Sequence, residues 1–404
     1  MRDDPGRLRF EIVARDGNAR AGVLHTPHGR IETPCFVPLA TRGSVKGLLA
    51  DEVAEAGYRM VLGNTYHLML APGGHRIAEL GGLHEFMAWE RAIITDSGGF
   101  QVFSLAHGTV ADEVKGRRGR PALQGGVLEI AEAGVRFRSY IDGSEHLLSP
   151  ERSMEVQRDL GSDIALAFDE CTPYRADRDY TARSTARTHR WLQRCLEWHD
   201  EHGPPSQAVF GIVQGGTYED LRRESAAAVS AAGIDGVAIG GTLGRDKEQM
   251  RGVIEVTLDH LPVDAPRHLL GIGEPDDLVE GVARGVDSFD CAVPTRLGRH
   301  GMALAPLPKS RFRYDVRKRS NEVERGPLVE GCPCPACTRH SRAYVHYLSK
   351  AEELTGVRLL TLHNLVYTAE LVREARAAIV AGRFQTFRGA IVDGAAPWEA
   401  AAPR

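Results

Sequence analysis

Short apolar runs recur along the chain, and segments with helical periodicity separate most of them. Each run has six or seven residues, a length typical of a buried strand. The eight runs span 35–40, 58–64, 91–96, 163–169, 208–214, 236–241, 267–273 and 287–292. Strands that alternate with helices form parallel sheets through βαβ units. Eight units over about 260 residues predict an α/β fold, a (β/α)8 TIM barrel spanning 35–300.

Helix signals lie between the later runs. The segment "SPERSMEVQRDLG" has Ser149 as an N-cap, Pro150 at the first helical position and Glu151 in the first turn. Helical periodicity also covers 180–201, 218–232, 246–260 and 275–285. These segments are expected to form the outer layer of the barrel.

Two segments fall outside this pattern. Residues 7–34 predict a β-hairpin with a turn at "ARDGNARAG", so 1–34 is expected as an N-terminal β extension. The Gly- and Arg-rich segment 107–134 predicts an insertion after the third strand. We expect this insertion to be a mobile loop, and an RNA contact through "GRRGR" is the alternative.

Charge and hydropathy narrow the class of protein. The 404 residues carry a formal net charge of -4, which argues against a surface that binds nucleic acid everywhere but allows a local basic patch. The opening "MRDDPGRLRF" mixes charges, and no apolar stretch approaches the roughly 18 residues that span a membrane. We therefore expect a cytoplasmic protein with no membrane partner.

Three of the seven cysteines stand close together, in CxCxxC spacing. They are Cys332, Cys334 and Cys337, whereas Cys35, Cys171, Cys195 and Cys291 are scattered. In a cytosolic chain such a group indicates metal ligation rather than disulfides. Three thiolates and one imidazole complete a closed, structural zinc site, with His340, His346 and His363 as candidates for the imidazole. The pattern predicts a zinc-binding subdomain with closing helices over 301–385 and a C-terminal tail at 386–404.

Polar residues and glycines stand where the apolar runs end. They are Asp96, Asp169, Gln214, Gly240–Gly241, Gly271 and Asp290. Asp and Gly end strands in many proteins, so one such position alone is weak support for a function. In a TIM barrel, however, the carboxyl ends of all strands converge on one mouth, where the active site lies. The repetition over consecutive strands predicts an active site containing several carboxylates.

A basic strip follows the eighth run. It contains Arg296, Arg299, Lys309, Arg311, Arg313, Arg317, Lys318 and Arg319, with Asp315 as the single acid and with Phe312 and Tyr314 among the basic residues. A solvated face is the simpler interpretation. Its place directly after the last strand, beside the mouth, favours a surface that follows a phosphate backbone.

Taken in order, the motifs resemble the signatures of the queuine/archaeosine tRNA-ribosyltransferase family, bacterial tRNA-guanine transglycosylases among them. The resemblance covers nearly the entire chain. The matching text is "GNTYHLMLAPG", "TDSGGFQVFSL", "LSPERSMEVQ" with "DLGSDI" one residue later, "AFDECTPY", "FGIVQGG", "GIGEPDDLVEGV" with "RGVDSFDCAVPTR" one residue later, and the CxCxxC with its distant histidine.

The resemblance implies an activity and its partners. The enzyme would be a pentosyltransferase of queuosine biosynthesis that exchanges the wobble guanine of GUN-anticodon tRNAs for a 7-deazaguanine, preQ1 or a related base. The exchange would proceed through a covalent ribosyl-aspartate intermediate. One structural Zn²⁺ per subunit and a homodimer are also implied.

The resemblance also assigns roles to residues. Asp290 in "FDC" would be the nucleophile and Asp96 in "DSGG" the general acid/base. Asp169, Gln214 and Gly241 would read the purine edge. The remaining implied residues are Phe100, Cys171 and Ser97 at the base, Arg296, Arg299, Lys309, Arg311 and Arg313 at the tRNA, and His363 as the fourth zinc ligand. Two carboxylates suit this chemistry, because one can trap the ribose carbon while the other moves a proton.

One motif departs from the family. Bacterial members commonly read "GGLAVGE" after the sixth strand, whereas this chain reads "GGTLGRD", with Arg245 near the expected acid. The preferred 7-substituent therefore stays open.

Three other functions are alternatives. The first is a non-catalytic tRNA-binding partner subunit, which would be expected to have lost the strand-end acids. The second is a transglycosylase that inserts 7-deazaguanines into DNA. The third is a zinc hydrolase built on a barrel, which the closed three-thiolate site disfavours because it has no open coordination position.

Overall fold

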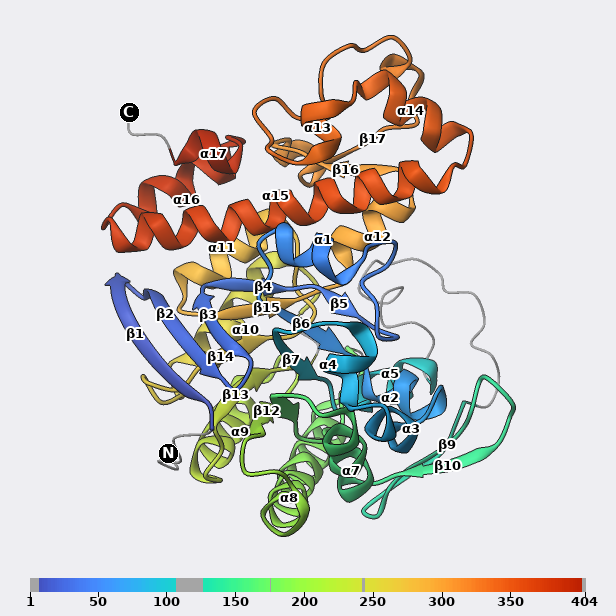
Figure 1. The fold of residues 1–404 in the computed structure, drawn as a ribbon. Coiled ribbons are helices and arrows are strands. Elements are labelled where there is room, and N and C mark those ends of the chain that lie inside the picture. The colour runs from blue at the N-terminus through green and yellow to red at the C-terminus, as the bar shows by residue number, and fades with distance from the viewer. Residues whose placement is uncertain (1–6, 107–125, 175, 242–243, 402–404) are drawn as a thin grey trace.

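The computed structural model contains the expected barrel of parallel strands, surrounded by helices (Figure 1). It describes residues 7–106, 126–174, 176–241 and 244–401. The barrel strands are β4 (Cys35–Val37), β5 (Leu39–Ala40), β6 (Met60–Gly63), β7 (Ala92–Thr95), β11 (Ile164–Leu166), β12 (Ala208–Val213), β13 (Gly236–Ile239), β14 (Arg267–Leu269) and β15 (Ser288–Asp290). The predicted (β/α)8 fold class is confirmed.

The first apolar run closes the barrel by dividing into two short strands. Its first half, β4, pairs with β15, and its second half, β5, pairs with β6. Pro38 stands between the halves and has no N–H to donate, but its carbonyl accepts a hydrogen bond from Leu62 N at 3.0 Å. One segment thus joins the first strand to the last, which closes the sheet on itself.

Alternate residues of the barrel strands face its interior. In β7, Ala92 and Ile94 belong to the interior cluster, whereas Ile93 packs outward against the helices. Because side chains alternate along a strand, the inward series of β7 continues to Asp96. The same series in β12 continues to Gln214. The strand period therefore directs both polar side chains into the carboxyl-terminal mouth.

Helices form the outer layer, as the sequence pattern predicts. Ser149 caps α7, since its side chain accepts a hydrogen bond from Arg152 N at 3.1 Å. The five predicted helices agree with the structure to within two residues at each end: α7 (Pro150–Leu160), α8 (Arg178–His202), α9 (Glu219–Ala231), α10 (Lys247–Leu258) and α11 (Pro275–Ala283). The other helices of this layer are α1 (Ala50–Glu55), α2 (Thr65–Leu70), α3 (Gly74–Glu79), α4 (Gly82–Met87), α5 (Gly99–Ala106) and α12 (Val293–Arg299).

The N-terminal extension has three antiparallel strands rather than the two of a hairpin. They are β1 (Arg9–Asp16), β2 (Ala19–Thr26) and β3 (Gly29–Thr33). Residues 27–28 form a second turn, and Gly29 after it has a φ of 115°, which favours glycine. Leu24 and Ile31 join the interior cluster of the barrel, so this sheet covers its amino-terminal end.

A second antiparallel sheet follows the third barrel strand. It contains β8 (Val127–Ala131), β9 (Gly134–Arg138) and β10 (Glu145–Leu148), and it projects beside the barrel (Figure 1). Only residues 126–134 of the expected 107–134 insertion belong to the described chain. The "GRRGR" segment lies outside the described residues.

The C-terminal part packs across the barrel through one long helix, α15 (Leu354–Val380) (Figure 1). Above α15 in Figure 1 lie β16 (Met302–Leu304), β17 (Arg313–Asp315), α13 (Pro335–Arg339) and α14 (Arg342–Lys350). Two 3₁₀ turns, η1 (Pro308–Ser310) and η2 (Arg319–Asn321), precede and follow β17 in the chain. The segment expected as a tail is helical, in α16 (Phe384–Asp393) and α17 (Pro397–Ala400). Phe387 and Ile391 of α16 are buried, which ties this segment to the core.

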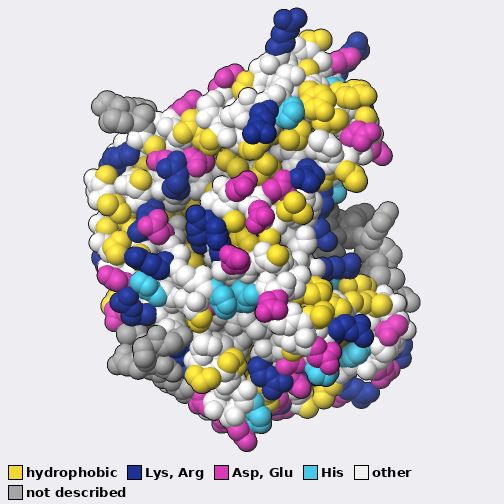
Figure 2. All heavy atoms as spheres, in the orientation of Figure 1, with side chains coloured by type: hydrophobic (Ala, Val, Ile, Leu, Met, Phe, Trp, Pro, Cys, Tyr) yellow, Lys and Arg dark blue, Asp and Glu magenta, His cyan; other side chains and the backbone are white. Residues whose placement is uncertain are grey.

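The surface fits the balanced composition. On the face shown in Figure 2, basic and acidic side chains are interspersed, without a continuous coat of one sign. Among the described residues, no helix combines the length and the hydrophobicity needed to cross a membrane.

A buried ion pair anchors the N-terminal sheet to the barrel. Arg20 of β2 and Asp287, which precedes β15, are each 1% exposed. Arg20 Nε donates to Asp287 Oδ1 at 2.8 Å, and its terminal nitrogens donate to the carbonyls of Val263 and Ala265. Asp287 also accepts from Arg267 N at 2.7 Å. Each charged group therefore has several partners, as a buried pair requires.

Arg20→Met is expected to lower the free energy of unfolding by about 3–5 kcal/mol, because it leaves the Asp287 carboxylate buried without its cation. Urea unfolding followed by circular dichroism measures this change. Arg9→Met is the matched control, since Arg9 is exposed on the neighbouring strand and its pair with Glu11 is worth less than about 1 kcal/mol. A loss below about 1 kcal/mol for Arg20→Met would contradict the anchoring role.

Candidate active site

Three aspartates from distant parts of the chain meet at the carboxyl-terminal mouth of the barrel. Asp96 follows β7, Asp169 lies shortly after β11, and Asp290 ends β15. Asp169 and Asp290 are 5% and 7% exposed, and Asp96 is partly buried. Ser97, next to Asp96, donates from Oγ to Asp169 Oδ1 at 3.1 Å. Asp290 reaches the same mouth because β15 ends at the same edge of the closed parallel sheet as β7 and β11.

Asp96 lies in a dense set of hydrogen-bond donors. Burial raises the pKa of Asp96 to about 7, and the nearby Asp290 charge acts in the same direction. The donors oppose this rise. They are Asn64 Nδ2, Thr65 N at 2.9 Å, Gly98 N at 3.2 Å and Gln101 Nε2 at 3.1 Å. A carboxyl group with a pKa near neutrality can both donate and accept a proton at working pH.

Asp169 and Gln214 form a buried hydrogen-bonded pair. Gln214 Nε2 donates to Asp169 Oδ2 at 2.5 Å, and Gln214 is only 1% exposed. Burial raises the pKa of Asp169 to about 6, although the bonds from Gln214 and Ser97 pull it down. A Cβ at Gly99 would lie 2.6 Å from the Asp169 carbonyl oxygen, so a glycine is needed for the two segments to come this close.

Asp290 is held by groups from the neighbouring strand. Gly271 N donates to Asp290 Oδ1 at 3.2 Å, and His268 Nε2 lies 3.2 Å from the same oxygen. His268 is fully buried in β14, and its Nδ1 lies 2.8 Å from Ser288 Oγ. The sequence motifs assign no role to His268. The feature that indicates its place in the site is an imidazole on the inward-facing side of the apolar run 267–273.

The other residues expected at the base lie around this set. Phe100 is the second residue of α5 and is 46% exposed. Gly241 has a φ of 84°, and a Cβ there would lie 2.3 Å from Gln214 Oε1. Burial raises the pKa of the Cys171 thiol to about 12, and Asp169 acts in the same direction. Cys171 therefore stays protonated and is not a thiolate nucleophile.

The basic strip divides into paired and unpaired residues. Glu274, at the start of α11, forms ion pairs with Arg311 and Arg313, with 3.5 Å between Arg313 Nη2 and Glu274 Oε1. The sequence showed Asp315 as the only nearby acid, because Glu274 reaches the strip only through the fold. Within the described parts of the chain, four residues of the strip form no ion pair with a carboxylate: Arg296, Arg299, Lys309 and Lys318.

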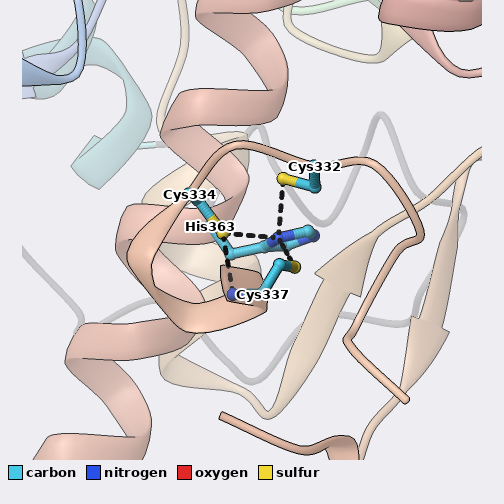
Figure 3. Close-up of side chains that lie close together, drawn as sticks. All are labelled: Cys332, Cys334, Cys337 and His363. Atoms are coloured by element: carbon cyan, nitrogen blue, oxygen red, sulfur yellow. Dashed lines mark hydrogen bonds between the residues drawn. The ribbon is translucent and has the colours of Figure 1, made fainter. Parts of the chain in front are cut away.

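The three clustered cysteines converge on His363 of α15 (Figure 3). The Sγ atoms of Cys332, Cys334 and Cys337 lie 3.6, 3.3 and 3.4 Å from His363 Nδ1. Tetrahedral zinc, with Zn–S of about 2.3 Å and Zn–N of about 2.0 Å, sets these atoms about 3.5 Å apart. His363 Nε2 lies 2.9 Å from the Leu304 carbonyl, which leaves Nδ1 free to bind a metal. The residues therefore fit a metal ion.

The two rival histidines lie outside this cluster. His346 Nδ1 lies 2.8 Å from the Val316 carbonyl oxygen. His340 stacks on Tyr344, with 5.2 Å between ring centroids. Folding therefore selects His363 from the three candidates.

A second group of histidines lies near the amino-terminal end of the barrel. His28 and His84 face the two oxygens of Asp163, with His28 Nδ1 2.8 Å from Oδ1 and His84 Nε2 3.3 Å from Oδ2. Their rings stack with centroids 3.6 Å apart and an interplanar angle of 18°. A metal ion lies in the plane of each imidazole that binds it, and two stacked rings share no such point. This group is therefore better explained by hydrogen bonding to Asp163 than by a metal.

The family model described as queuine tRNA-ribosyltransferase matches residues 16–396. The chain belongs to this family. Its queuine tRNA-ribosyltransferase relatives include a protein of Roseiflexus sp. (strain RS-1), 52% identical over 392 residues, covering 94% of this chain and 98% of the relative. Another, from Symbiobacterium thermophilum (strain DSM 24528 / JCM 14929 / IAM 14863 / T), is 48% identical over 389 residues, covering 96% of this chain and 91% of the relative.

Membership settles the class of the protein. The chain is a tRNA-guanine transglycosylase enzyme of queuosine synthesis, and its family implies tRNA and guanine-type substrates. The resemblance inferred from the motifs is confirmed. The two non-transglycosylase alternatives, the non-catalytic partner and the zinc hydrolase, are disfavoured.

The raised pKa of Asp96 predicts a pH-dependent stability in this transglycosylase. The folded pKa of about 7 exceeds the ordinary value of about 3.9, so the folded state binds the proton more tightly. Asp96 therefore lowers the free energy of unfolding progressively as pH rises from about 4 to about 7, with little further change above. Asp96→Asn removes this loss, so the melting temperature of the variant minus that of the wild type should increase from pH 5 to pH 8.

Thermal unfolding in matched buffers measures this difference. Asp51→Asn, an exposed change in the first turn of α1, should give a difference that varies little with pH. A difference for Asp96→Asn that is constant between pH 5 and pH 8 would show that Asp96 titrates in its ordinary range.

Proposed function

We propose that this enzyme exchanges the wobble guanine of GUN-anticodon tRNAs for a 7-deazaguanine, preQ1 or a related base, through a covalent ribosyl–Asp290 intermediate. The observation that carries the proposal is the convergence of Asp96, Asp169 and Asp290 at one barrel mouth. An anticodon-loop base can leave its stack and enter such a site at modest cost.

In the first step, Asp290 acts as the nucleophile. A carboxylate oxygen of Asp290 bonds to C1′ of the ribose while the C1′–N9 bond to guanine breaks. Protonated Asp96 supplies the proton that the departing guanine takes up. His268 and the Gly271 amide, both on Oδ1, hold the Asp290 carboxyl group in one orientation.

In the second step, the incoming base reverses these events. It loses its ring N–H proton to the Asp96 carboxylate, and its nitrogen bonds to C1′ while the C1′–Asp290 bond breaks. The proton given by Asp96 in the first step is thus recovered in the second. Two displacements at C1′ give overall retention, and neither step requires an external energy source.

The purine edge is read by complementary groups. A guanine-type edge presents a ring N–H and an amino group beside a carbonyl oxygen. The Asp169 carboxylate accepts from the two donors, and the amides of Gln214 and Gly241 donate to the carbonyl. The Gln214–Asp169 hydrogen bond supports this assignment, because it holds an acceptor and a donor side by side. Ser97 orients Asp169, Cys171 packs beside it, and the exposed Phe100 ring stacks on the base.

The basic strip binds the tRNA backbone in this proposal. Arg296, Arg299 and Lys309, which lack carboxylate partners among the described residues, are available to phosphates. Arg311 and Arg313 are oriented by Glu274 and contact the same backbone. Arg245 of "GGTLGRD", which stands near the acid expected in the family, is exposed and pairs with Asp246 at 2.9 Å. This pair does not identify the 7-substituent of the incoming base, which an assay determines.

A homodimer is also part of the proposal. Tyr347 and Leu354, close in sequence to the metal cluster, are 63% and 79% exposed, and hydrophobic side chains gather over this part of the surface in Figure 2. Exposed apolar patches of this kind commonly mark protein contacts. We also expect a cytoplasmic location, since thiolate ligands remain reduced there.

The decisive experiment is base exchange with radiolabelled guanine, on tRNA bearing a GUN anticodon and on duplex DNA. The wild type should label tRNA and, with free guanine withheld, form a covalent adduct on a denaturing gel. Asp290→Asn should bind tRNA within about twofold of the wild type but lose exchange by about 10³-fold or more and form no adduct. The exposed change Asp142→Asn should match the wild type.

Undiminished adduct in Asp290→Asn would remove that residue from the role of nucleophile. Labelling of DNA in place of tRNA would support the DNA-directed alternative. A panel of 7-deazaguanines, followed by mass spectrometry of the digested nucleosides, identifies the substituent.

We propose that the metal is one structural Zn²⁺ per subunit, held by the three cysteines and His363. Bound zinc would cross-link the 332–337 loop to α15 and would take no part in the exchange. Metal analysis should find about one zinc per chain. Cys334→Ala should lose the zinc and unfold the C-terminal part at lower temperature, whereas Cys35→Ser, outside the cluster, should retain it. Full zinc occupancy in Cys334→Ala would contradict the assignment.

A further inference from the structure

Arg222 is a fully buried arginine beside the proposed purine site. It lies near the start of α9, and its side chain is 0% exposed. Among the described residues, no carboxylate pairs with its guanidinium. Backbone carbonyls hold it instead, beginning with Gly216 O, to which Nε donates at 2.8 Å. A buried charge without an ionic partner is costly, so its place here calls for an explanation.

The other two acceptors lie at the ends of adjacent barrel strands. Nη1 of Arg222 donates to Val213 O at 3.1 Å and to Gly240 O at 2.7 Å. These carbonyls directly precede Gln214 and Gly241, the two residues proposed to bind the purine carbonyl. A single nitrogen therefore holds both peptide groups that lead into the carbonyl-binding pair.

The geometry of the peptide group converts this contact into an orientation. A trans peptide is planar, so the C=O of Gly240 and the N–H of Gly241 point in opposite directions. Binding of Gly240 O to Arg222 therefore fixes the direction of the Gly241 N–H. A Cβ at Gly241 would lie 3.1 Å from Arg222 Nη2, so glycine permits this close approach.

The charge of Arg222 adds to the effect of its position. Burial lowers the pKa of Arg222 to about 10, so the guanidinium remains a cation at neutral pH. A cation at a carbonyl oxygen polarises the peptide and strengthens its N–H as a donor. When the C1′–N9 bond breaks, negative charge spreads over the departing purine and its carbonyl oxygen. A donor held in a fixed direction at that oxygen would stabilise the charge with little reorganisation.

We propose that Arg222 is a positioning residue that orients the Gly241 amide and Gln214 toward the purine carbonyl, and that it thereby sets the preference for 6-oxopurines over purines without this oxygen. This inference rests on the proposed function, since it specifies how the same site reads its base.

The test compares guanine with 2-aminopurine, which keeps the amino group read by Asp169 but lacks the carbonyl oxygen and the ring N1–H. Asp169 is the same in every variant, so a change in the ratio of the two affinities on substitution of Arg222 reports the carbonyl side. Full-length, zinc-loaded protein is used, with 2-aminopurine fluorescence reporting binding directly and guanine measured by competition. Arg222→Met should bind 2-aminopurine within about twofold of the wild type but guanine about tenfold or more weakly. The ratio of the two dissociation constants should fall accordingly. A general loss of structure would weaken both bases together.

Arg223→Met is the matched control. Arg223 is the next residue on α9, is exposed and pairs with Glu219 at 3.3 Å. Its ratio should equal that of the wild type. Circular dichroism and thermal unfolding establish that each variant is folded.

A folded Arg222→Met protein with the wild-type ratio would overturn the inference, as would a wild type that shows no preference for guanine. If Arg222→Met does not fold, Arg222→Lys decides. Lysine keeps the positive charge and the aliphatic stem but lacks the guanidinium that bonds to the carbonyls of Gly216, Val213 and Gly240 together. The ratio of the two dissociation constants should therefore still fall severalfold. An unchanged ratio would overturn the inference. Failure of the proposed function is separate, because it appears as absent exchange in the wild type, whereas the binding ratio is measured without turnover.

Discussion

The barrel closes at Pro38, between β4, which pairs with β15, and β5, which pairs with β6. There Leu62 N of β6 donates a hydrogen bond to the Pro38 carbonyl. Through this short passage one segment pairs with both β15 and β6, and the sheet closes. Closure brings the ends of β7, β11 and β15 around one axis, although nearly two hundred residues separate Asp96 from Asp290. The period of two along each strand then decides which side chains enter the mouth. Every feature of the candidate active site depends on these two geometric facts.

The two ends of the barrel treat buried charge in opposite ways. At the amino-terminal end, Arg20 has a carboxylate partner in Asp287, and the pair ties the outer sheet to the barrel. At the mouth, burial raises the pKa values of Asp96 and Asp169, and Arg222 has only carbonyl acceptors among the described residues. The ion pair stabilises the fold, whereas at the mouth the carboxyl groups of Asp96 and Asp169 stay available to a substrate and Arg222 binds the backbone carbonyls next to them.

The C-terminal part connects the metal cluster to the mouth through α15. His363 faces the three cysteines, and its neighbour Asn364 bonds to β16 and α12. The Asn364 side chain accepts from Leu304 N at 2.7 Å and donates to the carbonyls of Pro294 and Met302, each at 3.0 Å. These bonds hold α12, which carries Arg296 and Arg299, against the same helix. A metal ion in the cluster would therefore stabilise the proposed tRNA surface without approaching the reacting atoms.

Local patterns in the sequence were sufficient for the barrel strands, the five predicted helices, the strand-end acids and the CxCxxC motif. Strand period, helix capping and ligand spacing are properties of neighbouring residues, so they can be read directly from the chain. Local spacing left His340 and His346 beside His363 as candidates; the family resemblance implied His363, and the structure places it with the cysteines. Other features were decided only by the tertiary structure: the pairing of Glu274 with Arg311, the contact of His268 with Asp290, and the third N-terminal strand. Most of these join residues far apart in the chain, and contacts of that kind exist only once closure and helix packing have fixed the distances. The pKa of Asp96 belongs with them, because it depends on water being excluded by segments that the local sequence does not specify.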